Sequence, residues 1–205
     1  MTDPSKPLRE EDVDPDPVRQ FTAWFEEARN AGVSQPEAAA LATASAEGAP
    51  SVRMVLVKQA DQDGFVFFTN YESRKGGELT ENPRAALLFH WEPFGRQVRI
   101  EGSVARTTRE QSVAYAHSRA RGSQLSAASS PQSRPVESRE FLERRVAELD
   151  DRYAGAEVPL PEHWGGFRLT PGRFEFWQHR DNRLHDRLGY TPDAAGGWRI
   201  ERLAP

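Results

Sequence analysis

The stretch from Phe174 to Tyr190 reads FEFWQHRDNRLHDRLGY and predicts a β-hairpin with a turn at 179–182. Side chains on a strand alternate between its two faces. An extended backbone after the turn therefore places three cationic or titratable side chains on one face: Arg183, His185 and Arg187. The other face carries the side chains between and beyond them: Leu184, Asp186 and Leu188. Trp177 lies near the end of the first arm, so the sequence brings an aromatic ring to a row of cations.

A row of Arg, His and Arg is unfavourable by itself, because like charges repel and desolvated cations need partners. The row therefore predicts an anionic or electron-rich ligand beside this strand. The alternative interpretation is an exposed hairpin edge, where cations discourage aggregation through the open edge of the sheet. The alternation alone does not decide between the two.

The composition limits the class of protein. A chain of 205 residues is long enough to bury a core, and we expect a flexible N-terminal arm over residues 1–15 and a single domain over residues 16–205. The net charge of -4 argues against a nucleic-acid-binding role. The absence of cysteine excludes disulfides, thiolate catalysis and Cys-ligated metal sites. Redox chemistry would therefore need a bound cofactor, and no metal is expected.

The N-terminal sequence is acidic and rich in proline, and it has no apolar segment. These features are not those of a signal peptide or a membrane anchor. We therefore expect a cytoplasmic protein that does not bind membranes.

Short apolar runs separated by turn residues predict an antiparallel meander, so the fold class is mainly β with flanking helices (α+β). Besides the hairpin, the expected strands span residues 38–44, 51–58, 65–69, 84–91, 96–106, 167–170 and 198–203. In the second of these strands, Arg53 and Lys58 point to opposite faces unless the strand bends.

Helices are expected between and before the strands. Asp16 and Pro17 predict the start of the first helix, and Gly32 predicts its end. A later helix is expected to begin near residue 138. The Ser-rich segment 123–135 that precedes it reads as a polar loop.

A phosphate site is predicted where the strand that ends at Thr69 meets a short helix. Ser73 is expected to cap this helix, which places Arg74 and Lys75 in its first turn. Free N–H groups at a helix start already favour an anion, and two cations strengthen that preference. The alternative is that both cations are only solvated. On a neighbouring strand, Gln97 offers an amide donor and acceptor of the kind that heterocycle recognition needs.

A second polar cluster is predicted at a helix that opens with Thr107 and Glu110, whose spacing fits a capping box. Tyr115 and Arg119 would share one face of this helix at i, i+4, and Ser123 lies just beyond it. A phenol, a guanidinium and a hydroxyl near one helix end are suited to a phosphate or a carboxylate.

Eight sequence blocks, in order along the chain, match one family. They are RMVLVK (53–58), FFTNYESRK (67–75), RQVR (96–99), YAHSRARGS (115–123), PQS (131–133), EFWQ (175–178), RLHDR (183–187) and RLAP (202–205). Together they resemble the pyridoxamine 5'-phosphate oxidase family over nearly the whole chain. The resemblance implies an FMN-binding split β-barrel that forms a homodimer, with FMN at the subunit interface.

The resemblance also implies the site residues. Those implied to bind FMN are Arg53, Met54, Val55, Leu56, Val57, Lys58, Phe68, Thr69, Arg74, Lys75, Gln97, Gln132, Ser133, Trp177 and Arg187. Those implied to bind the substrate phosphate are Lys58, Tyr115, Arg119 and Ser123. Arg183 and His185 would face the pyridine ring as substrate-binding and catalytic residues, and part of the FMN set would come from the second subunit.

The implied reaction oxidises pyridoxamine or pyridoxine 5'-phosphate to pyridoxal 5'-phosphate. A hydride equivalent leaves the C4' carbon for flavin N5, and O2 reoxidises the flavin to give H2O2. The protein supplies orientation and electrostatics. Arg183 would press the ring toward the flavin and His185 would orient the C4' substituent or the ring oxygen, so neither is required as a general base.

Two other functions stay open at this point. The chain could be a related split-barrel flavoprotein that acts on another substrate, such as a phenazine precursor, or one that uses a deazaflavin. It could also be a non-catalytic carrier of flavin or pyridoxal phosphate. A phosphate-free tricyclic substrate has little use for the cluster formed by Tyr115, Arg119 and Ser123.

The chain departs from the family pattern in places. His179 stands where Gly is usual and Phe68 where Tyr is common, and the Ser-rich loop has no Trp. The Arg and Tyr that some members place ahead of the LRxxD segment as a lid over the substrate are also not present before Leu8–Asp12.

Overall fold

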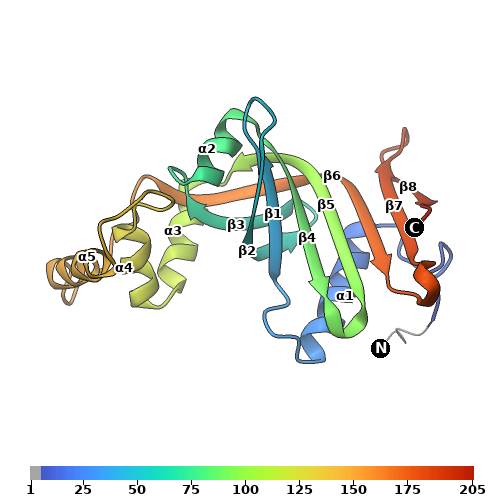
Figure 1. Cartoon of the computed structure of the whole chain (residues 1–205), viewed down its shortest axis with the longest axis horizontal. Coiled ribbons are helices and arrows are strands. Elements are labelled where there is room, and N and C mark those ends of the chain that lie inside the picture. The colour runs from blue at the N-terminus through green and yellow to red at the C-terminus, as the bar shows by residue number, and fades with distance from the viewer. Residues whose placement is uncertain (1–5) are drawn as a thin grey trace.

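Six antiparallel strands close into a β-barrel that forms the body of the molecule (Figure 1). The computed structural model describes residues 6–205. The barrel strands follow the order β3-β2-β1-β4-β5-β6, and β6 pairs back with β3, while β7 and β8 continue the sheet beyond β6. The bounds are β1 Ala38–Ala44, β2 Pro50–Asp61, β3 Gly64–Asn70, β4 Arg84–Trp91, β5 Arg96–Arg106, β6 Trp164–Gln178, β7 Asp186–Pro192 and β8 Trp198–Arg202.

Helix α1 (Pro17–Asn30) packs its apolar face against the barrel interior. Phe21 lies 4.9 Å from both Phe65 and Phe89, and Trp24 meets Phe176 edge-on at 5.3 Å. All five rings are buried, and burying a large apolar side chain contributes about 1.5–3 kcal/mol. Packing, rather than helix propensity, therefore holds α1 in place.

The ends of α1 agree with the sequence-based prediction. Asp16 accepts a hydrogen bond from the Val18 N–H at 2.8 Å, and Pro17 is the first helical residue. Gly32, just past the helix, has a φ of 78°, a conformation that glycine adopts without steric cost. The predicted start and stop are both confirmed.

Helix α2 (Arg74–Glu81) lies at the end of the barrel away from α1 (Figure 1). Ser73 caps it as predicted, since its side chain accepts a hydrogen bond from the Gly76 N–H. Gly76 has no room for a side chain, because a Cβ there would lie 2.1 Å from the Tyr71 carbonyl oxygen. This close approach fixes α2 on the chain that leaves β3.

The outer face of the barrel carries exposed apolar side chains on β2 and β4. Val52 is 68% exposed and Met54 is 64% exposed, while Leu56 and Leu88 are 36% and 37% exposed. Because β2 alternates, Arg53, Val55 and Val57 point the other way, as predicted. The pairing of β2 with β3 shifts register between Val57 and Gln59, so the strand is irregular at Lys58.

Three helices connect β5 to β6 and lie together at one side of the barrel (Figure 1). They are α3 Arg109–Ser118, α4 Arg121–Ser129 and α5 Arg139–Arg152. Helix α5 begins near residue 138 as predicted, and the Ser138 side chain caps it. Two predictions are wrong: the capping box is formed by Thr108 and Gln111, one residue later than expected, and most of the predicted Ser-rich loop is helix α4.

The predicted geometry of the 174–190 hairpin is also partly wrong. The backbone is not extended from residue 183, because Asp181–Arg183 forms a 3-10 turn and β7 begins at Asp186. Asn182 and Arg183 have φ angles of 56° and 61°, in the left-handed region. Strict alternation therefore does not apply to Arg183 and His185. The first arm is a strand as predicted, but it is continuous with the separately predicted strand 167–170, and together they form one long strand, β6.

The N-terminal segment runs along β7 and β8. The Tyr190 hydroxyl donates to the Asp14 carbonyl at 2.9 Å, and Val13 is buried. Residues 1–5 of the predicted arm lie outside the described residues, and the domain boundary at residue 16 stays a prediction. Between residues 6 and 205, no helix has the length and apolar character of a membrane span.

Candidate active site

A cationic cluster, called the Lys75 cluster below, forms where α2 begins, at the end of β3. Lys75 Nζ lies 3.1 Å from Thr69 Oγ1 and 3.0 Å from Gln132 Oε1. The Thr69 hydroxyl also donates to Gln132 Oε1 at 3.0 Å, across 63 residues of chain. Ser133, the next residue, has a φ of 71°. The segment that composition alone assigned to a loop therefore reaches the predicted phosphate site.

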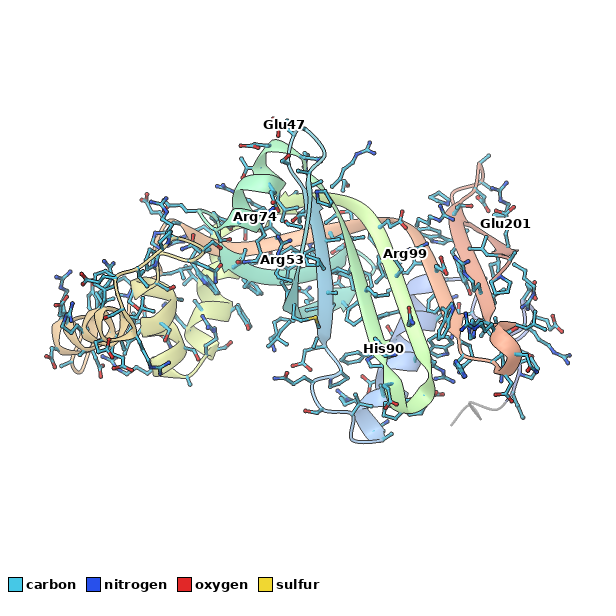
Figure 2. All side chains as sticks on the ribbon, viewed as in Figure 1. Glu47, Arg53, Arg74, His90, Arg99 and Glu201 are labelled. Atoms are coloured by element: carbon cyan, nitrogen blue, oxygen red, sulfur yellow. The ribbon has the colours of Figure 1, made fainter. Side chains whose placement is uncertain are left out.

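Glu78 holds two further cations at the same place. Its carboxylate accepts from Arg74 Nε at 2.9 Å and lies 3.3 Å from Arg53 Nη2 (Figure 2). Burial alone would raise the pKa of Glu78, but hydrogen bonds from Ser51, Thr43 and Arg74 outweigh it and bring the pKa to about 2. Glu78 is therefore ionised over the working range of the protein and orients both guanidinium groups.

Lys75 is held in a position that disfavours its own charge. Burial lowers the pKa of Lys75, and the neighbouring Arg53 lowers it further. Arg53, Arg74 and a protonated Lys75 carry three positive charges, and Glu78 carries one negative charge. The cluster therefore has two net positive charges. A phosphate monoester carries about −1.5 to −2 charges at pH 7, so the donor set and the charge both fit such a group.

An aromatic stack lies on the other face of β3. The Phe68 ring stacks on Tyr115 at 3.9 Å and on Trp164 at 5.7 Å. The guanidinium of Arg119 lies over Trp164 at 5.1 Å, and its Nη1 has no hydrogen-bond partner among residues 6–205. An unpaired guanidinium nitrogen beside a phenol can accept an anionic ligand.

The helix predicted to carry this cluster differs in detail. Tyr115 lies in α3, but Arg119 is the residue that caps its C-terminus, and Ser123 lies in the first turn of α4. The three therefore come from a break between two helices and not from one helix face. The break leaves the N-terminal turn of α4 close in the chain to Arg119, whose Nη1 has no hydrogen-bond partner among residues 6–205.

The hairpin brings His185 against Trp177, with ring centroids 4.6 Å apart. His179 is close to both, 5.1 Å from His185 and 6.1 Å from Trp177. The Arg180 N–H donates to His185 Nδ1 at 3.1 Å. Because Nδ1 accepts a hydrogen bond, a neutral His185 carries its proton on Nε2.

Gln97 and Trp177 face each other across β5 and β6 and line one cavity of about 420 Å³ with His90 and His179. Arg187 pairs with Trp177 in the register of β6 and β7, and its Nε donates to Glu175 at 2.7 Å. Three of the predicted flavin residues therefore lie side by side in one row of the sheet.

One chain does not bring the whole predicted set together. The cluster of Arg53, Thr69, Arg74, Lys75 and Gln132 lies where α2 begins, while the row of Gln97, Trp177 and Arg187 crosses β5, β6 and β7, whose places Figure 1 shows. Lys58 belongs to neither group, because its Nζ lies 3.1 Å from Glu37 Oε1. Met54 and Leu56 also belong to neither group and lie on the exposed outer face of β2.

Sequence reasoning missed three residues that shape these sites. Glu78 follows Arg74 at i+4, a helical ion-pair spacing that could have indicated it. Glu175 alternates with Trp177 on the first arm and holds both Arg187 and Arg99. Trp164 has no local signal, because its stack with Phe68 joins two distant parts of the chain.

Two family models match the chain. The model described as pyridoxamine 5'-phosphate oxidase covers residues 25–153, and the model of the pyridoxine 5'-phosphate oxidase C-terminal dimerisation region covers residues 164–205. The chain belongs to the pyridoxamine 5'-phosphate oxidase family. The predicted family and its split-barrel fold are thus confirmed.

Relatives in this oxidase family match over nearly their full length. The pyridoxine/pyridoxamine 5'-phosphate oxidase of Rubrobacter xylanophilus is 57% identical over 198 residues, which is 97% of this chain and 91% of the relative. The protein of that name from Bordetella pertussis is 56% identical, over 97% of this chain and 93% of its own.

Solved structures agree on the fold. PhzG from Burkholderia lata 383, in complex with tetrahydrophenazine-1-carboxylic acid, superimposes with a TM-score of 0.90 at 33% identity and covers 97% of this chain and 98% of its own. A pyridoxamine 5'-phosphate oxidase-related, FMN binding protein from Nostoc punctiforme has a TM-score of 0.71 at 17% identity, over 92% of this chain and 97% of its own. The latter shows likeness of fold alone.

Proposed function

We propose that this protein is an FMN-dependent oxidase that converts pyridoxamine 5'-phosphate and pyridoxine 5'-phosphate to pyridoxal 5'-phosphate, with O2 as acceptor and H2O2 as product. The observation that carries the proposal is the presence of two separate anion sites. One surrounds Lys75, and the other lies at Arg119 on the opposite face of β3. A phosphorylated cofactor and a phosphorylated substrate together need two such sites.

The first site would hold the FMN phosphate. Arg53, Arg74 and Lys75 would contribute charge, while Thr69, Gln132 and Ser133 would contribute hydrogen-bonding groups. The net charge of the Lys75 cluster supports this assignment. Burial disfavours the charged form of Lys75, and a bound phosphate would favour it. Trp177, Gln97 and Arg187 would contact the flavin ring, together with Phe68 and the backbone and side chains of 53–58.

A homodimer would join the two halves of this site. The exposed apolar face on β2 and β4 lies next to the residues proposed to touch the cofactor, and large exposed apolar patches mark interaction surfaces. The match to a C-terminal dimerisation region supports the same assembly. A two-fold axis would bring the Lys75 cluster of one chain toward the row of Gln97, Trp177 and Arg187, the Trp177 row, of the other.

The second site would hold the substrate phosphate. Arg119 Nη1 has no hydrogen-bond partner among residues 6–205, and Tyr115 and Ser123 would add hydroxyl groups. Lys58 can join only by exchanging its ion pair with Glu37 for a phosphate oxygen. The phosphate would then anchor the ring at a fixed distance from the hairpin.

The hairpin residues would orient the reacting carbon. Bound FMN supplies the hydride acceptor and the route to O2. His185, with Nδ1 occupied by the Arg180 N–H, offers its Nε2–H to an oxygen of the substrate. Arg183 would lie against the pyridine ring and compensate charge there. The protein therefore acts by positioning, without a nucleophile of its own.

The test starts with purified protein and added FMN. A yellow protein that consumes O2 and forms an aldehyde from pyridoxamine 5'-phosphate is expected, and a colourless protein that takes up no FMN would contradict the proposal. Pyridoxine 5'-phosphate should be oxidised far faster than unphosphorylated pyridoxine. Arg119→Gln should shrink this preference by about 2 kcal/mol, the scale for a hydrogen bond to a charged group, whereas Arg139→Gln on exposed α5 should leave it unchanged.

A second candidate is favoured by the similarity to PhzG. A TM-score of 0.90 allows a related split-barrel flavoprotein that acts on a phenazine precursor. Equal rates with phosphorylated and unphosphorylated pyridoxine would favour this candidate. A carrier without turnover would instead bind both ligands but fail to bleach its flavin when mixed anaerobically with pyridoxamine 5'-phosphate.

A further inference from the structure

Asp186 is the first residue of β7 and follows His185 directly, yet its carboxylate does not face the predicted ligand sites. It accepts hydrogen bonds from three separate parts of the chain. Oδ2 receives the Leu8 N–H at 3.1 Å and Arg180 Nε at 2.7 Å, and Oδ1 receives Arg202 Nη1 at 2.9 Å. The side chain is only 15% exposed, so these bonds are poorly screened by water.

One of the three bonds leads to the catalytic hairpin. The side chain that Asp186 binds belongs to Arg180, and the backbone N–H of Arg180 donates to His185 Nδ1. Asp186 thus closes a short loop in which residues 180 and 186 are joined by an ion pair and His185 lies between them. Fixing Arg180 fixes the donor that selects the tautomer of His185.

The other two bonds lead to the N-terminal segment. Arg202 binds Asp186 and also reaches Glu10 Oε2 at 2.8 Å and the Leu8 carbonyl at 2.7 Å. Leu8 is therefore held through both its N–H, by Asp186, and its carbonyl, by Arg202. The ends of a chain are usually poorly ordered unless they are tied down, and here the Asp186 carboxylate, which is partly buried beside the hairpin, binds the segment.

We propose that Asp186 is a positioning residue that holds His185 and the N-terminal segment Leu8–Glu10 as one unit. Its carboxylate fixes the His185 imidazole through Arg180 and fixes the segment through Leu8 and Arg202. The consequence for catalysis rests on the function proposed above. The structural coupling between the segment and the imidazole does not.

The experiment uses the full-length, FMN-loaded protein and three variants that divide the contacts. Asp186→Asn removes the charge that all three donors share. Arg180→Gln removes the link to His185, and Arg202→Gln removes one of the links to the N-terminal segment. Glu201→Gln is the control, because this carboxylate lies next to Arg202 on β8 but, among residues 6–205, pairs only with exposed Arg199 (Figure 2).

Two NMR readouts report on structure without turnover. They are the 15N shifts of the His185 ring, which give its tautomer, and the hydrogen-exchange rate of the Leu8 amide. Asp186→Asn should mix the tautomers and speed Leu8 exchange about tenfold or more, as for a lost hydrogen bond to a charged group. Arg180→Gln should change the tautomer alone and Arg202→Gln the exchange alone. Glu201→Gln should change neither.

Activity gives the third readout. Asp186→Asn should lower kcat for pyridoxamine 5'-phosphate about tenfold or more, the scale of one mispositioned group, while FMN affinity stays within about threefold. Asp186→Asn with wild-type tautomer and wild-type Leu8 exchange would overturn the proposal. So would an Asp186→Asn variant in which Leu8 exchange changes and the His185 tautomer does not. If Asp186→Asn does not fold, the separate responses of Arg180→Gln and Arg202→Gln decide in the same way.

The two proposals can fail separately. A wild-type protein that does not oxidise pyridoxamine 5'-phosphate would overturn the proposed function. The tautomer and the Leu8 exchange would still test Asp186 in that case.

Discussion

At the scale of single residues, Arg183 and Arg187 differ more than their spacing indicates. Arg187 lies in a regular strand and is fixed at both ends of its guanidinium, by Glu175 and by the Ala204 carbonyl. Arg183 lies in the 3-10 turn with a φ of 61°, a conformation that costs a non-glycine residue about 1–3 kcal/mol. Such strain is usual where a side chain must be aimed at a ligand.

The two arginines should therefore fail in different ways. Arg183→Ala should lower kcat/KM by an amount that corresponds to about 2–4 kcal/mol of activation free energy, as for the loss of a positioned charged group. FMN should stay bound, because its phosphate has its own cations at Arg53, Arg74 and Lys75. Arg187→Ala should weaken FMN retention first. FMN affinity and kcat/KM measured for both variants check this, with exposed Arg199→Ala as control.

The reverse pattern, in which Arg183→Ala loses flavin and Arg187→Ala only slows turnover, would show that the roles along the hairpin are assigned wrongly. The sequence could identify both arginines but not their geometry. Period-two alternation assumes an extended backbone, and Asn182 and Arg183 leave it. Of these two residues, only Asn182 is of a type that often adopts a positive φ, so the sequence gives no signal at Arg183.

At the scale of elements, capping chemistry decided what could be predicted. Asp16 and Ser73 are strong caps followed by clear helical patterns, and α1 and α2 begin where they indicate. Helix α4 begins after Ala120 without a side-chain cap and consists of Ser, Ala and Gly to a large extent. Its helicity comes from packing on α5, which a local pattern does not contain. The contact of Gln132 with Lys75 is likewise tertiary. The family resemblance placed both residues in the FMN set but did not predict that they touch.

Helix α2 also gives a pH-dependent prediction through Glu78. Its folded pKa of about 2 is below its usual 4.5, so its stabilising contribution is complete above about pH 4.5 and is lost as the pH falls toward 2. The full contribution is on the order of 3 kcal/mol at neutral pH. Urea unfolding at about pH 6.5 and about pH 3 should show that wild type loses about 2 kcal/mol more than Glu78→Gln over this interval.

Glu81→Gln is the control, because this exposed carboxylate lies on the same helix and its substitution should leave the wild-type pH dependence unchanged. If wild type and Glu78→Gln lost the same unfolding free energy over this interval, Glu78 would not be the carboxylate whose protonation destabilises the protein in acid. Glu78→Gln should also bind FMN with altered affinity at neutral pH, because Arg53 and Arg74 lose the carboxylate that both of them bind.

At the scale of the whole molecule, the residues proposed to bind FMN form two groups that lie apart in one chain. The Lys75 cluster lies at the start of α2, the Trp177 row crosses β5, β6 and β7, and the outer face of β2 is apolar and exposed. Sequence patterns contain no signal for this division, because alternation predicts which side chains point outward but not what covers them. The exposure of Val52 and Met54 is therefore the structural clue to a second copy.

A change at this face should uncouple assembly and cofactor together. Val52→Asp places a charge on the proposed interface at a residue that is 68% exposed and is not among the proposed cofactor ligands. It should shift the protein toward monomer and lower FMN affinity in parallel, because a ligand bound across two chains stabilises their association. Val136→Asp, the same change at an exposed residue away from β2, should do neither. Sedimentation velocity at falling protein concentration, read at a flavin wavelength, follows both quantities in one experiment. A monomer that keeps its full flavin content would contradict a site shared between subunits. Each chain would then hold FMN with either the Lys75 cluster or the Trp177 row alone.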